Sequence, residues 1–308
     1  MQVIQNNIES VNQCDLCGSS NLQPEISVQT WNLVRCGKCR LVFTSPRFSE
    51  GYCRQRYEHN YYEKSLNYFS SQLEKPSEDE NRLAQSMQRQ LKSQVGIRRL
   101  RSIDIGCGAG RIVQAFQNNG WEAMGLDLSK KAIDTGVGRG LDLRRTSLED
   151  PSLGLFDLIT CFHVLEHMHR PGNFLGQVAA SLVAGGYFLV EVPNYGSRIA
   201  MRMGKNWPYL YPDLHLYQFT IDTAKEYLRR SGFSILLLER VHGKGPLELH
   251  SPKEDQPERW RDIKKSLFAL RHIIYWSPFL KRLTRHLFWN TLGFGECIRI
   301  LARKGDCR

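Results

Sequence analysis

The stretch RSIDIGCGAGR, residues 101–111, leads from a short apolar run into a loop with three alternating glycines, Gly106, Gly108 and Gly110. Glycine is needed where the backbone turns tightly or where a ligand comes close to the main chain, because it lacks a Cβ. The spacing differs from the G-x-G-x-x-G that cradles a pyrophosphate, and no Gly-Lys-Ser/Thr follows to make a Walker loop. The stretch therefore predicts a ligand-binding turn between a strand and a helix that is of neither type.

From about residue 98 onward, apolar strand patterns alternate with helical patterns. The first five such segments are LRSIDI, RIVQAFQNN, WEAMGLD, SKKAIDTGV and LDLRRT. This alternation indicates βαβ units with right-handed crossovers and a mostly parallel sheet. Such a sheet binds its ligand at the carboxyl ends of its strands, which is where the glycine loop falls.

Two later strand ends point to a nucleoside. The second predicted strand ends in GLDLS, so Asp127 follows the loop by about 20 residues and can accept hydrogen bonds from both hydroxyls of a ribose. The third runs into TSLED, which can present Ser147 and Leu148 to an adenine. A purely structural turn is the alternative for the loop alone, but the combination favours an adenosine-containing ligand.

Four of the nine cysteines form two pairs with a two-residue spacing, Cys14 with Cys17 and Cys36 with Cys39. This spacing lets two thiolates from one tight turn face a single ion. Four thiolates fill a tetrahedral zinc shell and leave no position for water, so the pattern predicts a structural zinc ribbon. Four unrelated buried thiols are the alternative.

The whole chain has 308 residues with 41% hydrophobic, enough for one large domain and a smaller one. Its first ten residues lack the basic and apolar parts of a secretory signal, and no apolar run reaches the roughly 18 to 20 residues that cross a bilayer. We therefore expect a cytoplasmic protein. The formal net charge of +11 leaves contact with nucleic acid or an anionic membrane open.

Taken together, these stretches resemble the class I S-adenosylmethionine-dependent methyltransferases. The resemblance is carried by IDIGCGAGR, GLDLS, FDLITCFHVLEHMHRPGNFL, GGYFLVEVPN and HLYQFTIDTAKEYLRRSGF. It implies an α/β, Rossmann-like fold with a mostly parallel seven-stranded sheet, whose antiparallel last strand is GECIRILARK. The cysteine pairs and the aromatic segment after them resemble a subgroup that includes sugar C-methyltransferases.

The same resemblance implies the residues that hold S-adenosylmethionine. Asp127 would bind the ribose, and Phe162 and His163 would lie near the methionine. The rest of the methionine end would be lined by Asp104, Gly106, Gly108 and Gly110, and the adenine by Leu128, Ser147 and Leu148.

We expect three parts: a zinc ribbon over residues 1–50, an aromatic and helical connector over 51–97, and the methyltransferase domain over 98–308, with a helical insertion at about 243–293. Within the insertion, residues 261–285 carry seven lysines and arginines against one acid, interleaved with apolar residues. This segment could contact an anionic membrane peripherally at its inner face. A helical lid packed on the domain is the alternative.

His163, Glu166 and His167 share one face if this stretch is helical, because they stand at positions i, i+3 and i+4. Some members of the resembling family use a similar cluster for a divalent metal. The alternative is that these residues pack beside the cofactor, and the sequence does not distinguish this role from metal binding.

His215 lies in DLHLYQFT, which follows the fifth predicted strand near the ligand end of the sheet. Imidazole, with a pKa near 6.5, suits removal of a proton at neutral pH. Sugar C-methyltransferases resemble this stretch, although Leu214 stands where they carry an acid. We therefore predict His215 as the general base, against the alternative that it only ties the loop to the sheet, and Thr220 as the cap of the next helix.

The predicted function is methyl transfer from S-adenosylmethionine to a small-molecule acceptor, such as a nucleotide-linked sugar or a lipid-linked intermediate. One alternative is a zinc-ribbon RNA methyltransferase, which the arginines at 47, 54 and 56 keep open. Another is a non-catalytic binding module on the same scaffold. The acceptor atom and the oligomeric state are not predictable from the sequence.

Overall fold

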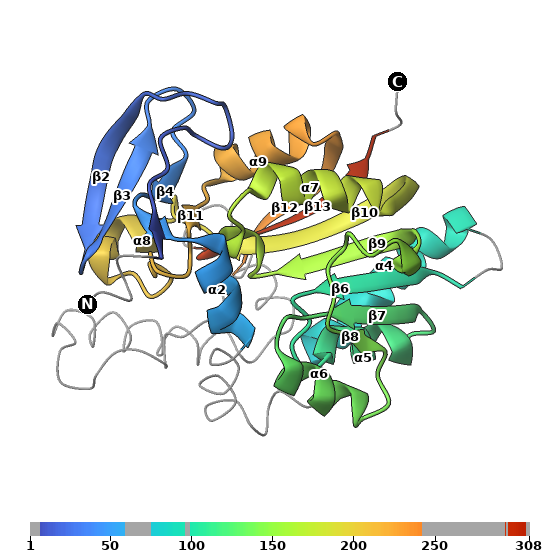
Figure 1. Cartoon of the computed structure of the whole chain (residues 1–308). Helices are drawn as coiled ribbons and strands as arrows, with labels where there is room; N and C mark the ends of the chain where they lie inside the picture. Colours follow the sequence, from blue (N-terminus) through green and yellow to red (C-terminus); the bar gives the residue numbers. More distant parts are fainter. Residues whose placement is uncertain (1–6, 59–74, 96–98, 242–292, 294, 306–308) are drawn as a thin grey trace, which may run out of the picture.

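The computed structural model describes residues 7–58, 75–95, 99–241, 293 and 295–305 (Figure 1). Its largest sheet has seven strands in the order β12-β13-β10-β9-β6-β7-β8. Of these seven, β13 alone runs antiparallel to its neighbours β10 and β12. The predicted fold class is thus confirmed. The strands are β6 (Arg101–Ile105), β7 (Glu122–Leu126), β8 (Leu143–Arg144), β9 (Phe156–Phe162), β10 (Leu182–Pro193), β12 (Phe233–Val241) and β13 (Cys297–Lys304).

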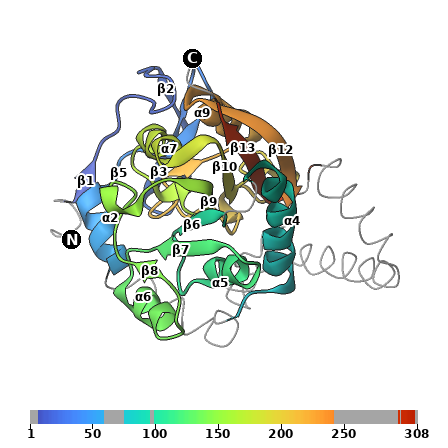
Figure 2. The same cartoon turned by 90° about the vertical axis from the view of Figure 1, so that its right-hand side faces the viewer.

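Helices cover both faces of this sheet (Figure 1, Figure 2). One face packs against α4 (Glu78–Val95), α5 (Arg111–Asn118) and α6 (Lys130–Val137), through Met87, Phe116 and Ile133 among others. The other packs against α7 (Pro171–Ala180) and α9 (Ile221–Arg230). Thr220 caps α9 as predicted: its side chain accepts from the N–H of Thr223, and the Thr223 hydroxyl accepts from the N–H of Thr220.

The N-terminal segment forms a small antiparallel sheet that includes a strand from the distant part of the chain. Its order is β11-β4-β3-β2, where β11 (Tyr217–Gln218) pairs with β4 (Val42–Thr44). The other two strands are β3 (Trp31–Cys36) and β2 (Leu22–Val28). Because β11 lies just before α9, the small sheet is anchored to the seven-stranded part.

Arg47 reinforces this junction from β5 (Arg47–Phe48), which pairs with β1 (Ile8–Glu9). The side chain is only 5% exposed. Its guanidinium donates to the carboxylate of Glu9 at 2.8 Å, to the hydroxyl of Tyr217 at 3.2 Å and to the carbonyl of His169 at 3.1 Å. A buried arginine needs such partners, because removing a charge from water is costly.

Several expectations fall wholly or mostly outside the described residues. They include the helical insertion at 243–293 and the membrane contact through 261–285. The three-part division of the chain stays a prediction. Among the described helices, none is long and apolar enough to span a membrane.

We expect Arg47→Ala to lower the free energy of unfolding by about 1.5 to 3 kcal/mol, the range for hydrogen bonds that involve a charged group. The matched control is Arg54→Ala, whose side chain is exposed and whose loss should change stability by less than about 0.5 kcal/mol. Urea unfolding followed by circular dichroism measures both. Equal stability of the two variants would contradict the role given to Arg47.

Candidate active site

The glycine loop follows β6 directly and leads into α5. Gly106, Gly108 and Gly110 all adopt left-handed backbone angles, with φ of 71°, 54° and 84°. A Cβ on Gly106 would also lie 2.3 Å from Cγ2 of Val164. The N–H groups of Gly106 and Cys107 donate to the carbonyl of Leu126, which ties the loop to β7. Glycine is therefore required by both the turn and its packing.

Asp127 comes directly after β7 and faces the loop. Its Oδ2 accepts from the N–H of Gly108 at 2.9 Å, and its Oδ1 accepts from the N–H of Ser129 at 2.8 Å. Burial raises the pKa of Asp127, while these backbone hydrogen bonds lower it. Each oxygen keeps a further lone pair, so the carboxylate can still accept from a ribose hydroxyl.

Asp104 lies inside β6, 5% exposed, and its Oδ1 accepts from the Thr160 hydroxyl at 2.6 Å. Burial raises its pKa to about 7, and the charge of Asp127 adds to the increase. A carboxylate with this pKa gains from a nearby cation, such as the ammonium group of a methionine moiety. The two carboxylates at the ends of β6 and β7 thus fit the ammonium and the ribose hydroxyls of an adenosyl–methionine ligand.

The other residues predicted for the cofactor lie at neighbouring strand ends. Leu128 follows Asp127, and Ser147 and Leu148 follow β8; all three are half-buried. Phe162 ends β9, and His163 follows it. The strand ends therefore bring the predicted cofactor residues to one edge of the sheet, as expected for parallel strands.

His163 is held between two buried carboxylates. It has a left-handed backbone with φ of 56°, unusual for a residue with a side chain. Its Nδ1 lies 3.4 Å from Oε1 of Glu166, and its Nε2 lies 3.3 Å from Oε1 of Glu191. Burial lowers the pKa of His163, but its contacts with Cys297 and both glutamates outweigh burial and raise the pKa well above 6.5.

The prediction that His163, Glu166 and His167 share one helical face is wrong for His163. A short 3-10 turn spans Leu165–His167, and His163 lies before it with a left-handed backbone. The chain leaves β9 through a sharp turn, so the helical spacing rule does not apply to His163. Instead, Glu166 and His167 group with His215: one ligand atom from each lies within 4.8 Å of the others.

Glu166 is fully buried, and its carboxylate oxygens have no hydrogen-bond partner among the described residues. Burial raises its pKa, yet the neighbouring histidines outweigh burial and lower the pKa to about 2. The ring of His167 meets that of His215 edge-on, with centroids 4.8 Å apart. Nδ1 of His167 lies 2.8 Å from the Tyr57 hydroxyl and 2.9 Å from the carbonyl oxygen of Leu214.

His215 donates its Nδ1–H to the carbonyl of Tyr209 at 2.7 Å. Burial and the electrostatic influence of neighbouring His167 lower its pKa to about 3. The imidazole is therefore neutral at pH 7, with its Nε2 lone pair free of a proton. This arrangement can accept a proton from an acidic donor.

Sequence reasoning missed Glu191, Tyr209, Cys297 and Arg299. Arg299 donates through Nε to Oε2 of Glu191 at 2.7 Å, and its Nη2 lies 2.7 Å from the same oxygen in an ion pair. The ring of Tyr209 stacks on that of His163, with centroids 6.1 Å apart and planes at 9°. One signal was present, a glutamate inside the otherwise apolar strand GYFLVEVP. The partners depend on the pairing of β10 with β13, which no local pattern reveals.

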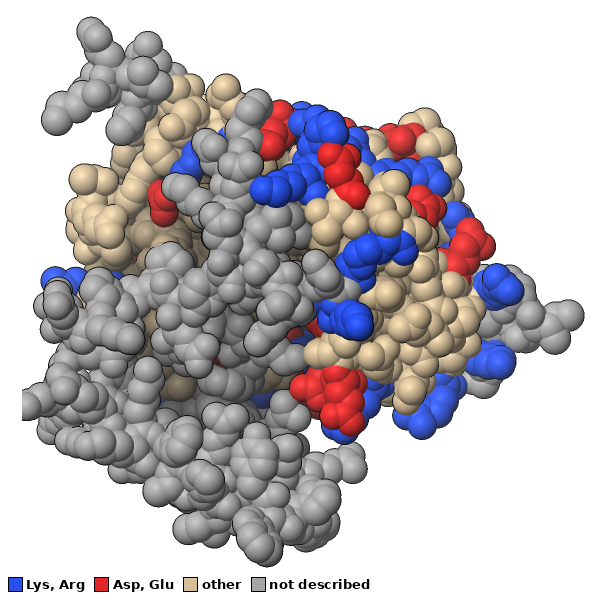
Figure 3. Space-filling model, turned by 90° about the horizontal axis from the view of Figure 1, so that it is seen from below, with Lys and Arg blue, Asp and Glu red and all other residues tan. Residues whose placement is uncertain are grey.

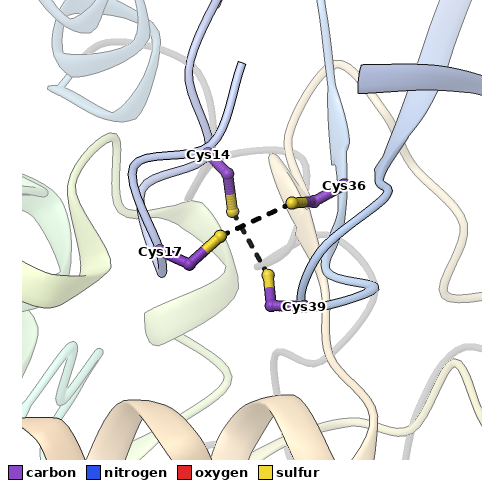
Figure 4. Close-up of side chains that lie close together, drawn as sticks. All are labelled: Cys14, Cys17, Cys36 and Cys39. Atoms are coloured by element: carbon purple, nitrogen blue, oxygen red, sulfur yellow. Dashed lines mark hydrogen bonds between the residues drawn. The ribbon is translucent and has the colours of Figure 1, made fainter. Parts of the chain in front are cut away.

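The four predicted zinc ligands converge (Figure 4). Sγ of Cys14 lies 3.4 Å from Sγ of Cys39, and Sγ of Cys17 lies 3.5 Å from Sγ of Cys36. Tetrahedral zinc with bonds of about 2.3 Å would separate its sulfurs by about 3.8 Å. The turns that carry them are closed by hydrogen bonds from Gly18 N–H to Cys14 O and from Arg40 N–H to Cys36 O. The four thiols fit a closed structural zinc site.

Comparison with known proteins identifies the family. The family model described as a methyltransferase domain matches residues 54–238, more than half of the chain. The ubiquinone biosynthesis O-methyltransferase of Thiobacillus denitrificans is 30% identical over 105 residues, which are 31% of this chain and 45% of that protein. Its counterpart in Bradyrhizobium sp. is 37% identical over 103 residues, 31% of this chain and 40% of that protein. The chain thus spans less than half the length of these relatives.

Two solved methyltransferase structures align with most of this chain. A SAM-dependent methyltransferase from Archaeoglobus fulgidus aligns with a TM-score of 0.48 and 20% identity, covering 80% of this chain and all of that one. The plantazolicin methyltransferase BpumL, in complex with SAH, aligns with a TM-score of 0.49 and 14% identity, covering 82% of this chain and 94% of that one. On the family match and the seven-stranded sheet, this chain belongs to the methyltransferase-domain family and has the fold of S-adenosylmethionine-dependent methyltransferases.

Proposed function

We propose that this chain transfers a methyl group from S-adenosylmethionine to a hydroxyl or carbon of a small-molecule acceptor. The observation that carries the proposal is the arrangement at the ends of β6 and β7, where Asp104, the glycine loop and Asp127 face one another. The sulfonium of the donor supplies an activated methyl group. The protein then has to hold donor and acceptor in line and to remove a proton where the acceptor requires it.

Each cofactor residue has a proposed role that follows from its chemistry. Asp104 binds the methionine ammonium, and Asp127 binds the ribose hydroxyls while it holds the loop through Gly108. The adenine lies between the turn after β7 and the turn after β8, against Leu128, Ser147 and Leu148. Phe162 and His163 close the methionine end.

His215 is the proposed general base. Its Nδ1–H is committed to the Tyr209 carbonyl, which leaves Nε2 as the proton acceptor. A pKa of about 3 makes it a weak base, but a hydroxyl becomes strongly acidic as its oxygen gains the methyl group. A weak base that is never protonated at neutral pH suffices for such a proton.

The acceptor is a small metabolite, and we retain a nucleotide-linked sugar or a lipid-linked intermediate as its proposed class. The two relatives described above are named for ubiquinone biosynthesis, which also involves a small acceptor. Support for RNA is weaker, because Arg47 is buried in internal contacts and Arg56 pairs with Asp213. On the described face seen in Figure 3, basic and acidic side chains are interspersed.

We also propose that the ribbon holds one structural zinc through Cys14, Cys17, Cys36 and Cys39. A metal with four protein thiolates has no open position, so it stabilises the fold and takes no part in chemistry. The zinc would stiffen the sheet that pairs β4 with β11.

Removing the zinc, or changing Cys17 to serine, should unfold the N-terminal sheet, because a structural zinc supplies the folding free energy of its own small domain. Elemental analysis of the purified chain should find zinc, and Cys17→Ser should contain one equivalent less. The matched control is Cys53→Ser, a buried cysteine outside the cluster, which should keep the metal. A wild-type chain without zinc, even after refolding with the metal, would refute the ribbon site.

Asp127→Ala should weaken binding of S-adenosylmethionine and of its demethylated product by about 1 to 3 kcal/mol, because ribose hydroxyls lose their acceptor. Calorimetry measures the affinity. Asp142→Ala, an exposed aspartate before β8, should bind as the wild type does. Unchanged affinity of Asp127→Ala for the cofactor would contradict the proposed contact between Asp127 and the ribose.

His215→Ala should lower turnover by about 10²- to 10⁴-fold with donor affinity retained. The lowered pKa of about 3 keeps the imidazole unprotonated at neutral pH, so turnover at saturating donor should show no limb from His215 near pH 6.5. The limb that belongs to His215 should appear only near pH 3. Steady-state kinetics across this range, with donor affinity checked by calorimetry, tests both points. A loss of less than tenfold would exclude His215 as the base.

A further inference from the structure

His163, Glu191 and Cys297 converge where three strands of the large sheet meet. Glu191 lies near the end of β10, His163 follows β9, and Cys297 begins β13, paired with Pro193. One potential ligand atom from each lies within 4.8 Å of the other two. Cys297 is fully buried and Glu191 is 6% exposed. The methyl transfer proposed above uses neither Glu191 nor Cys297.

One interatomic distance within this group fits two ligands of a single ion. Nε2 of His163 lies 3.3 Å from Oε1 of Glu191. Two ligands of a tetrahedral zinc, with bonds of about 2.0 to 2.1 Å, lie about 3.3 to 3.5 Å apart. The observed separation falls in this range.

Neighbouring side chains orient His163 and Glu191, two of the three potential ligands. Nε and Nη2 of Arg299 both lie 2.7 Å from Oε2 of Glu191, the first in a hydrogen bond, which leaves Oε1 facing His163. On its other side, Nδ1 of His163 faces the buried carboxylate of Glu166 at 3.4 Å. A carboxylate beside the second ring nitrogen of a metal-ligating histidine commonly helps to orient the ring. The stacked ring of Tyr209 restricts the imidazole further.

The backbone of His163 gives independent support. A non-glycine residue with φ of 56° is strained, and such strain persists where the surroundings demand a particular side-chain direction. Here the left-handed turn directs the imidazole between Glu166 and Glu191.

We propose that Nε2 of His163, Oε1 of Glu191 and Sγ of Cys297 bind one divalent cation of the zinc type, with the fourth position open to water or to an acceptor oxygen. A mixed nitrogen, oxygen and sulfur donor set is one that zinc accepts, and three protein ligands leave the site open, unlike the four cysteines of the ribbon. Metal binding is measured without methyl transfer, so its failure is distinguishable from failure of the proposed function; only an acceptor oxygen at the open position rests on that function.

The test counts metal in the full chain. Wild type and variants are saturated with Co²⁺ without oxygen, freed of unbound metal, and measured for cobalt content and for thiolate-to-cobalt charge-transfer absorption. Cys297→Ser should bind one equivalent less than the wild type and lose the corresponding part of the absorption. Glu191→Gln should show the same loss of metal. This variant replaces Cys297→Ser in the test if Cys297→Ser does not fold. Folding is checked by circular dichroism.

Two controls separate this site from its neighbours. Cys53→Ser removes a buried thiol outside the cluster and should keep the wild-type metal content. His215→Gln removes a member of the adjacent Glu166, His167 and His215 group and should also keep it. The proposal is overturned if folded Cys297→Ser and Glu191→Gln retain the wild-type cobalt content, or if His215→Gln loses an equivalent that they keep.

Discussion

The carboxylate of Asp127 joins two successive strand ends, and the proposed cofactor site depends on that junction. It accepts one N–H from the glycine loop after β6 and one from the turn after β7. Three glycines in left-handed conformations would otherwise leave the loop poorly ordered, because glycine loses the most freedom on folding. The N–H of Gly108 is already hydrogen-bonded to Asp127. The loop therefore contributes mainly its shape, which lets a ligand approach the backbone closely.

The proposed acceptor side depends on a different constraint, the pairing of the N-terminal sheet with β11 beside the seven-stranded sheet. The segment that carries Tyr209 and His215 ends in β11, and β11 is a strand of the N-terminal sheet. Arg47 fastens the same region by bonding Tyr217 and the carbonyl of His169. A zinc ion in the ribbon would therefore influence the proposed acceptor region around His215 only through the rigidity of this sheet.

Local chemistry explains which features could be predicted. The glycine loop, Asp127, the cysteine pairs and the Thr220 cap each depend on short spacing, which the sequence displays directly. The contact of Glu191 with Arg299 depends on the antiparallel register of β10 and β13, whose residues are more than a hundred positions apart. The orientation of His163 depends on a left-handed turn that helical spacing does not anticipate.

The central claim is that the strand ends of β6 and β7 hold an adenosyl–methionine cofactor. A crystal structure of the full chain with S-adenosylhomocysteine, the demethylated form of the donor, tests it most directly. The account predicts one molecule per chain, with the ribose hydroxyls on Asp127, the amino group near Asp104 and the sulfur directed toward His163. A ligand bound elsewhere, or a chain that binds a nicotinamide dinucleotide at this edge and not S-adenosylhomocysteine, would contradict it.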